Sequence, residues 1–363
     1  MDADQVLAFR LGRSGLVERS ARSLADAAAC PASDFARDAA LLALAARADN
    51  VSRDSYREAI EGGDLAVAHV IRGAIHALAP SDLALYGRAL IASDDGELGH
   101  QLGQQVRRLV ADGGLTAGEA LDEVAEATTD ALAGGVAPDR NELHAALRER
   151  VRPELMPWCR SCKSHHVAPM LWRYATVKAG ARLDSERRYT LAAPRPTPRA
   201  SDTLRRFLGF YGPASPGDFA DWAGIAKAHA RRVWDEVSAE LAEVRVGEAR
   251  GWLLREDVDV LDSVPAARGV RLLPPGDPYL QKPNRSLLAP DAVLRKRLFR
   301  PVASPGAVLR DGRLAGLWRT KLKGRKAEVT IEPLERMRRT DLEPEGARVA
   351  SLRGGADLAL VLA

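Results

Sequence analysis

Four cations crowd a single turn late in the chain: Lys321, Lys323, Arg325 and Lys326. Their chemistry is the binding of phosphate groups. Residues 291–339 carry fourteen Lys and Arg against five Asp and Glu. Alternating apolar residues predict strands at 307–309, 314–318 and 329–331. The dipeptide Asp311-Gly312 predicts a hairpin turn between the first two strands. Cations this dense on a folded β-element indicate a polyanion as the partner.

The charge balance differs between the two halves of the chain. Residues 1–150 hold fifteen Arg, no Lys and twenty-four Asp and Glu, a balance of −9. Residues 151–363 have a balance of +13, which the overall charge of +4 conceals. Attraction to phosphates should therefore concentrate in the second half. The alternative is a set of solvated faces with a basic tail, but charges on folded patterns favour duplex DNA as the partner.

A second group with possible chemistry lies in the segment PELMPWCRSCKSHHVAP: Cys159, Cys162, His165 and His166. Thiolate and imidazole are common ligands of zinc. A zinc site usually draws its second pair of ligands from another loop, so that four donors surround the ion. Here all candidates lie within eight residues, which only a tight turn could bring around one ion. The sequence therefore favours a tight structural or DNA-facing turn, and it predicts no metal and no other cofactor.

Residues 201–263 predict the element order of a helix-turn-helix with a hairpin. Helices are expected at 202–210, 215–224 and 226–241, followed by paired strands at 243–246 and 252–255. The third helix is the one normally presented to DNA, and it holds Lys227, His229, Arg231, Arg232 and Trp234. Arg231 and Arg232 either reach phosphates and base edges or pair with Asp235 and Glu236 on a solvated face.

Several segments resemble the AlkZ/YcaQ-like winged-helix family. They are LLPPGDPYL (272–280), RKRLFRP (295–301), GRLAGLWRTKLKGRKAEVTIEPL (312–334), RFLGFYGPASPGDFADWAG (206–224) and VIRGAIHALAPSDL (70–83). The resemblance spans most of the chain, with the order and spacing kept. It implies tandem winged-helix units that hold DNA across a concave face. Some members of the family are DNA glycosylases that unhook bulky or crosslinking alkyl lesions.

The same resemblance places candidate catalytic residues in CPASDFARD, residues 30–38. Catalytic members carry Gln-x-Gln or Gln-x-Asp before an Ala/Leu-rich helix. That helix is matched at 39–47, but no Gln occurs between Val6 and His100. The motif positions fall on Ala32, Ser33 and Asp34, with an ambiguity of one residue. Asp34 would position water beside an oxocarbenium-like sugar, with Ser33 bonding that water. The alternative is that Ser33 or Asp34 caps the following helix.

The segment Arg72-Gly73-Ala74-Ile75-His76 matches a family segment of the form RGTLH. Arg72 and His76 could reach a phosphate or a lesion. Alternatively, Arg72 is a buried structural residue paired with Asp64 or Asp82, and His76 lies half in the core. The sequence does not decide between them.

Together these features predict a mainly helical α+β protein. Tandem winged-helix units are expected at 1–112, 113–195 and 201–263, followed by a basic β-barrel or sheet at 264–363. Thr116 and Glu119 predict a capping box, and the proline-rich segment 194–201 predicts a linker. Beyond the basic strands, the expectation is a polar tail with a short strand at 358–362.

The composition narrows the class further. No apolar run reaches the roughly 20 residues that a membrane-spanning helix needs, and the N-terminal residues lack the features of a signal peptide. Three cysteines need no oxidising compartment. The expectation is a cytoplasmic monomer that contacts no membrane. Its predicted function is duplex DNA binding, as a monofunctional glycosylase-like protein for alkylated or bulky purines. The alternatives are a non-catalytic damage sensor or transcription regulator, or an antibiotic-resistance protein that uses the same cavity.

Overall fold

The computed structural model describes residues 1–35, 38–261 and 263–363. Its contacts divide the chain into two compact units, and each combines segments that are distant in sequence. Unit 1 comprises Met1–Ala59, Arg205–Asp218 and Ala239–Ala363, and unit 2 comprises Ile60–Leu204 and Phe219–Ser238. The chain mixes helix and sheet, as predicted. The four modules expected along the sequence stay a prediction, because one compact unit can combine parts of several modules.

The main sheet of unit 1 is built from the basic C-terminal region. Its strands follow one another in chain order: β10 (Val270–Leu273), β11 (Gly306–Arg310), β12 (Arg313–Lys323), β13 (Lys326–Pro333) and β14 (Asp357–Leu362). All pairs are antiparallel except β13 with β14. The sheet is open, so the barrel alternative was wrong and the sheet alternative was correct. Asp311 and Gly312 have φ angles of 50° and 81°, as the predicted two-residue turn requires.

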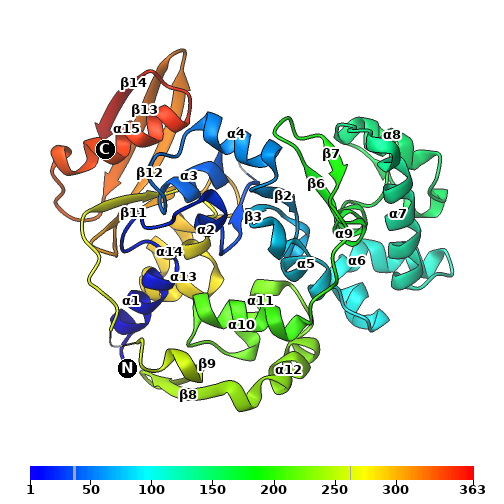
Figure 1. Ribbon diagram of the computed structural model, residues 1–363, viewed down its shortest axis with the longest axis horizontal. Helices are drawn as coiled ribbons and strands as arrows, with labels where there is room; N and C mark the ends of the chain where they lie inside the picture. Colours follow the sequence, from blue (N-terminus) through cyan, green and yellow to red (C-terminus); the bar gives the residue numbers. More distant parts are fainter. Residues whose placement is uncertain (36–37, 262) are drawn as a thin grey trace. The chain divides into compact units, whose positions relative to one another are not determined.

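Helices cover both faces of this sheet (Figure 1). They are α1 (Ala3–Arg13), α3 (Ala39–Ala45), α13 (Lys282–Leu288), α14 (Ala292–Leu298) and α15 (Arg339–Leu352). Because side chains alternate along a strand, Val308 packs with α3 and α15, whereas Leu309 packs with α1, α13 and α14. The polar tail expected at this end was wrong for residues 339–352. Their Leu342, Val349 and Leu352 give α15 a buried face against the sheet.

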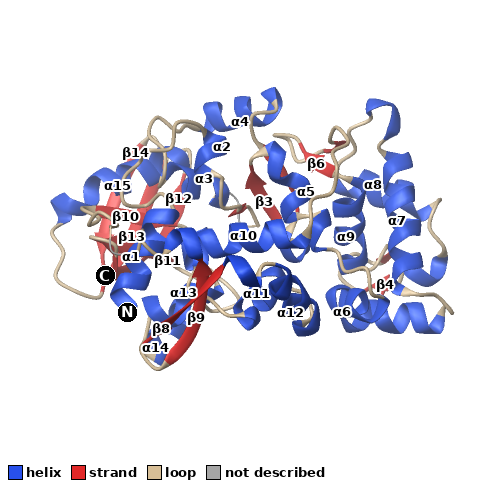
Figure 2. Cartoon of the chain, turned by 60° about the horizontal axis from the view of Figure 1, so that its bottom comes forward, coloured by secondary structure: helices blue, strands red, loops and turns tan. Residues whose placement is uncertain are grey.

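The remaining elements of unit 1 include a short strand at the predicted motif. They are α2 (Leu24–Ala27), β1 (Ala32–Ser33), α4 (Arg53–Gly62), α10 (Ala200–Tyr211), β8 (Leu241–Val246) and β9 (Ala249–Leu254). The last residues of α4 and the first of α10 belong to unit 2. Strands β8 and β9 form a separate two-stranded ribbon (Figure 2). Ala214 adds a single bridge to Trp252 of β9.

Unit 2 holds a second sheet, in which four strands are neighbours in the order β3 (Ile75–Leu78), β2 (Ala66–His69), β6 (Ala181–Leu183) and β7 (Tyr189–Leu191). A small hairpin is formed by β4 (Trp158–Cys159) and β5 (Ser164–His165). The helices are α5 (Leu83–Tyr86), α6 (Asp95–Asp112), α7 (Ala117–Ala131), α8 (Arg140–Arg148), α9 (Pro169–Ala179), α11 (Pro216–Ala223) and α12 (Lys227–Glu236). The first residues of α11, up to Asp218, belong to unit 1. The predicted capping box of Thr116 and Glu119 starts α7.

The order α10, α11, α12, β8, β9 is the order expected for residues 201–263. Its assignment as a DNA-reading winged helix stays a prediction. Among the described residues, no helix has both the length and the apolar character to cross a membrane.

Candidate catalytic motif and nucleic-acid interface

Asp34, the predicted catalytic carboxylate, lies inside unit 1 with 4% of its surface exposed. Its Oδ1 accepts a hydrogen bond of 3.2 Å from the backbone amide of Ala40, in the first turn of α3. Amides in a first helical turn have no partner within the helix, so this bond is the one that the capping alternative requires. Asp38, directly before α3, makes no such cap and pairs with Arg53 and Arg353. Catalysis by Asp34 stays a prediction.

Ser33 is the partly exposed residue of the motif, since Ala32 and Asp34 on either side are buried. Gly276, in the LLPPGDPYL segment, lies beside it. A methyl group at Gly276 would meet Cβ and Oγ of Ser33 at 3.5 Å. Gly276 has a φ of +84°, a conformation that favours glycine. The loop therefore brings bare backbone to Ser33, whose hydroxyl can bond water or a ligand at the surface.

Phe35 follows the motif and is 80% exposed. An aromatic ring in this position can stack on a nucleobase or enter a base step. The exposure of Phe35 could not be predicted from the sequence, because a Phe before an apolar helix is more often a core residue.

The motif is supported by a buried ion pair. Arg47 donates to both carboxylate oxygens of Asp277, at 2.8 and 2.9 Å. It also donates to the carbonyls of Ser14 and Ala43. Burial alone would lower the pKa of Arg47, but the charge and hydrogen bonds of Asp277 raise it overall. The guanidinium is therefore charged and fixed, and it holds the loop that carries Gly276.

Cys30 precedes the motif and is also structural. Its thiol contacts the hydroxyl of Tyr211 at 3.5 Å, and that hydroxyl donates to the carbonyl of Pro278. Burial raises the pKa of the Cys30 thiol to about 12. A thiol with so high a pKa carries almost no thiolate at neutral pH, so Cys30 is not a nucleophile.

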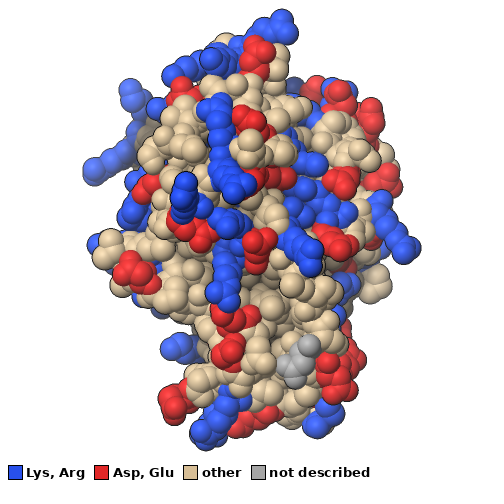
Figure 3. All heavy atoms as spheres, turned by 90° about the vertical axis from the view of Figure 1, so that its left-hand side faces the viewer, with Lys and Arg blue, Asp and Glu red and all other residues tan. Residues whose placement is uncertain are grey.

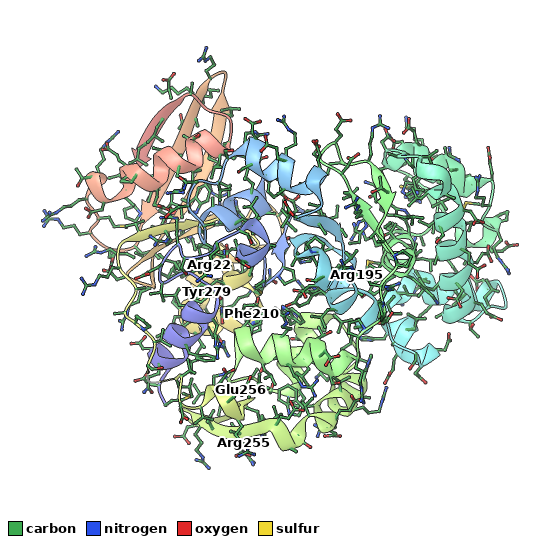
Figure 4. The ribbon with its side chains drawn as sticks, viewed as in Figure 1. Arg22, Arg195, Phe210, Arg255, Glu256 and Tyr279 are labelled. Carbon is green, nitrogen blue, oxygen red and sulfur yellow. The ribbon has the colours of Figure 1, made fainter. Side chains whose placement is uncertain are left out.

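A cavity of about 420 Å³ opens beside Cys30. Its lining includes Arg13, Arg22, Arg47 and Phe210. Figure 4 labels Arg22 and Phe210 among these residues. Among the described residues that line it, Asp26 is the one carboxylate. The sequence gives no signal for Asp26, because its place in the first turn of α2 is typical of a surface acid.

The predicted cationic turn is the exposed end of the β12–β13 hairpin. Lys321, Lys323, Arg325 and Lys326 are all exposed. Lys323 pairs with Glu328 at 2.8 Å. The charges of Lys323, Lys321 and Lys326 also lower the pKa of Glu328, after its hydrogen bond to Lys323. Three cations around one carboxylate leave a positive excess at this end of the hairpin.

The same sheet carries a hollow of about 610 Å³, lined in part by Lys296, Arg297, Arg300, Arg319 and Glu332. Arg297 pairs with Glu332. Arg300 and Arg319 both donate to the carbonyl oxygen of Ala303. Burial and the neighbouring charge of Arg300 lower the pKa of Arg319. Two guanidinium groups thus converge on one neutral acceptor, which is an arrangement that an anion would stabilise. We call this hollow and the hairpin end the basic face.

Part of the positive charge counted in the sequence is already neutralised. On the face drawn in Figure 3, Asp and Glu lie among the Lys and Arg side chains. Arg310, Arg313 and Arg339 pair with Glu335, Asp4 and Glu343 respectively. The count for residues 291–339 therefore overstates the number of unpaired cations, and the basic face holds the local excess.

In unit 2, Arg72 binds the end of helix α11. Its Nη1 donates to the carbonyls of Trp222 and Asp221, at 3.0 and 3.4 Å. A methyl group at Gly224 would lie 2.5 Å from Cγ of Arg72. These contacts are structural, and the pairing of Arg72 with Asp64 or Asp82 stays a prediction. A DNA contact by Arg72 stays a prediction.

His76 lies in the core of unit 2, with 3% of its surface exposed. Its Nδ1 lies 2.9 Å from the carbonyl oxygen of Ala74. Burial lowers the pKa of His76 to about 4, and the hydrogen bond to Ala74 acts in the opposite direction. His76 is therefore neutral at physiological pH and more deeply buried than the half-core position considered above.

The predicted DNA-contacting residues of helix α12 lie in different environments. Arg232 is bound to both carboxylate oxygens of Glu97, at 2.8 and 2.5 Å, and Nδ1 of the half-buried His229 lies 4.0 Å from the same carboxylate. The paired alternative thus describes Arg232, with a partner that the sequence did not indicate. Lys227 and Arg231 are exposed, and Trp234 is a buried core residue.

Comparison with known proteins matches the chain to a family model, to a characterised relative and to a solved structure. The family model described as DNA glycosylase AlkZ-like matches residues 29–352. The chain is 28% identical, over 372 aligned positions, to an interstrand DNA cross-link repair glycosylase of Streptomyces sahachiroi, and the alignment covers 96% of each chain. The solved structure of the Streptomyces sahachiroi DNA glycosylase AlkZ has the same fold, with a TM-score of 0.79, 23% identity and 100% of both chains covered.

Proposed function

This chain belongs to the AlkZ-like DNA glycosylase family, and from that premise we propose that it binds duplex DNA and releases alkylated or bulky purines from it. The relative from Streptomyces sahachiroi is a cross-link repair glycosylase. Crosslinking alkyl adducts are therefore the first lesions to test. The protein acts as a monomer in this proposal.

The basic face is the observation that carries the proposal. Arg300 and Arg319 share one carbonyl acceptor, and the exposed cations of the hairpin end lie on the same sheet. Phosphate oxygens would replace the shared carbonyl with charge-assisted hydrogen bonds. Helix α12 adds Lys227 and Arg231, which are exposed and placed to contact phosphates if the helix-turn-helix interpretation holds.

The proposed chemistry is hydrolysis of the N-glycosidic bond. The bond between C1′ and the purine breaks, the cationic alkylated base leaves neutral with the electron pair, and water adds its oxygen to C1′ and loses a proton. A carboxylate near the developing oxocarbenium ion stabilises it and can accept the proton of water. Asp34 is the predicted residue, and Asp26 in the adjacent cavity is a second candidate. Residues 1–150 contain no lysine that could form a Schiff base from this part of the chain.

A second candidate function is DNA binding without catalysis. It is favoured by the hydrogen bond from Ala40 to Asp34, which occupies one oxygen of the carboxylate, and by the lack of Gln from Val6 to His100. A damage sensor needs the basic face and a surface for the lesion, but no group that activates water.

Duplexes with one 7-methylguanine, one 3-methyladenine or one nitrogen-mustard cross-link separate the two functions. The protein is added in excess, and abasic sites are revealed by cleavage in hot alkali. Abasic sites in the damaged duplex alone support the glycosylase. Tight binding in an anisotropy titration without abasic sites supports the non-catalytic binder, and failure to bind any duplex removes both.

A further inference from the structure

The hairpin of β4 and β5 in unit 2 assembles a group of side chains that the proposed DNA chemistry does not use. Trp158 pairs with His165 and Cys159 with Ser164, so the chain reverses between Cys159 and Ser164. Cys162 lies in this reversal, and His166 follows β5. One short segment can surround a metal ion only through a tight turn, and the hairpin is such a turn.

Three residues offer ligand atoms at close range. The sulfurs of Cys159 and Cys162 and a ring nitrogen of His166 all lie within 4.8 Å of one another. In a tetrahedral zinc site these atoms would be about 3.6–3.8 Å apart, given the usual Zn–S and Zn–N bond lengths. Each separation therefore needs to shorten by roughly 1 Å at most. Rotations of the two cysteine side chains on a surface turn can supply such a change.

The imidazole of His166 is already oriented as a metal ligand. Its Nδ1 lies 2.9 Å from the carbonyl oxygen of Val167. A carbonyl only accepts, so Nδ1 carries the proton and Nε2 carries the lone pair. Ligating histidines are typically held by such a bond from the other ring nitrogen.

The lone pair of His166 Nε2 accepts no hydrogen bond from the described residues. His166 is 7% exposed, and among the described residues its Nε2 has no hydrogen-bond partner. A buried polar atom without a partner is costly unless a water or an ion satisfies it. The two sulfurs are the chemically suited groups beside it, since thiolate and imidazole together select zinc over magnesium or calcium.

We propose that Cys159, Cys162 and His166 bind one Zn²⁺ ion, with water in the fourth position on the exposed side of Cys162. The ion braces a hairpin of only two residue pairs, which would be marginal on its own. It also protects two accessible thiols, because Cys162 is exposed and Cys159 is partly so. The motif around Ser33 and Asp34 belongs to unit 1, and the proposal assigns the metal no part in base release.

The test uses the full-length protein, expressed with added zinc and purified with a reductant and without chelators. Elemental analysis should give about one zinc per chain. Cys159→Ser with Cys162→Ser, and separately His166→Asn, should reduce the zinc content at least tenfold. Cys30→Ala is the matched control, because Cys30 is a buried thiol outside the hairpin, and it should keep its zinc.

A cobalt titration of the parent protein reports the coordination geometry of the metal, and its result does not depend on whether a variant folds. Parent protein stripped of metal, reduced and titrated with Co²⁺ should show thiolate charge-transfer bands and the intense visible bands of a tetrahedral ion. These bands should bleach when Zn²⁺ is added. Absence of zinc from the purified parent together with absence of these bands overturns the proposal. Zinc that persists in the double cysteine variant overturns it equally.

Discussion

Arg47 and Asp277 form a buried pair in which the guanidinium donates to both carboxylate oxygens, at 2.8 and 2.9 Å. Arg47 follows α3, the helix that begins just after the motif, whereas Asp277 lies in the LLPPGDPYL segment more than two hundred residues away. Asp277 is the neighbour of Gly276, where an added methyl group would lie 3.5 Å from Ser33. The pair therefore holds two distant segments together at the candidate site.

Replacing Asp277 with Asn should lower the free energy of unfolding by about 3–5 kcal/mol, because it leaves the charge of Arg47 buried without compensation. Urea denaturation followed by circular dichroism measures the change. Glu343→Gln, in the exposed pair with Arg339, is the control and should change stability by less than about 1 kcal/mol. Equal effects of the two substitutions would show that the buried pair has no special role.

Acid should destabilise the protein through its buried imidazoles. Burial lowers the pKa of His76 from 6.5 to about 4 and that of His69 to about 3. As the pH falls below 6.5, the unfolded chain binds protons that the folded chain does not, so stability declines. For His76 the decline runs from pH 6.5 to about pH 4 and amounts to about 3 kcal/mol.

His76→Asn should flatten this part of the stability curve, because Asn does not titrate and its amide can still donate to the carbonyl of Ala74. Denaturation in urea at a series of pH values gives both curves. His100→Gln is the control, since His100 is exposed and meets water in both states. Parallel curves for the parent and His76→Asn would contradict the assignment of His76 as a neutral buried residue.

Local sequence signals predicted local structure well. The strands at 307–309, 314–318 and 329–331, the Asp311-Gly312 turn and the Thr116 capping box each depend on residues close together in the chain. Helix α15 was missed because it contains Pro344 and five charged residues among its fourteen, and only a few apolar positions such as Leu342 and Val349 meet the sheet.

The candidate site was harder to predict, because its contacts join distant segments. Nothing near Ser33 indicates that Gly276 lies against it, and nothing near Arg232 indicates Glu97 as its partner. The sequence also does not show that Asp34 and His76 are buried, because polar side chains of these types commonly lie on a surface. The Cys159 cluster was discounted because the spacing alone does not reveal the reversal of β4 into β5.

Duplex affinity should depend on the hairpin end of the basic face. Changing Lys321, Lys323, Arg325 and Lys326 together to Ala should weaken binding and leave the thermal midpoint nearly unchanged, since exposed charges contribute little to folding. The plot of log affinity against log salt should become shallower by about 0.9 for each phosphate that the variant no longer neutralises. Fluorescence anisotropy at a series of salt concentrations measures both quantities.

A matched control removes the same charge elsewhere: Arg107, Arg108, Arg148 and Arg150, all exposed in unit 2, are changed to Ala. Its salt slope should stay close to that of the parent. If both quadruple variants lose affinity equally, net charge rather than the basic face drives binding. If the hairpin variant binds as tightly as the parent, the phosphate-binding residues lie elsewhere, with Arg231 on α12 the next residue to test.

The last prediction concerns catalysis. The protein should release alkylated purines from duplex DNA and leave an abasic site in an uncut strand. Asp34→Asn should then lower the single-turnover rate by about two orders of magnitude or more, because it removes a negative charge that stabilises the developing cation. It should cost only about 1 kcal/mol of stability or less, since Asn caps a helix nearly as well as Asp.

Asp26→Asn, in the cavity beside Cys30, is assayed in parallel. A large loss of rate in that variant alone would move the water-positioning role from Asp34 to Asp26, and Asp34 would keep only its bond to Ala40. If the parent protein, in excess over the duplex, releases no base from any of these lesions, the enzymatic interpretation fails and only DNA binding remains.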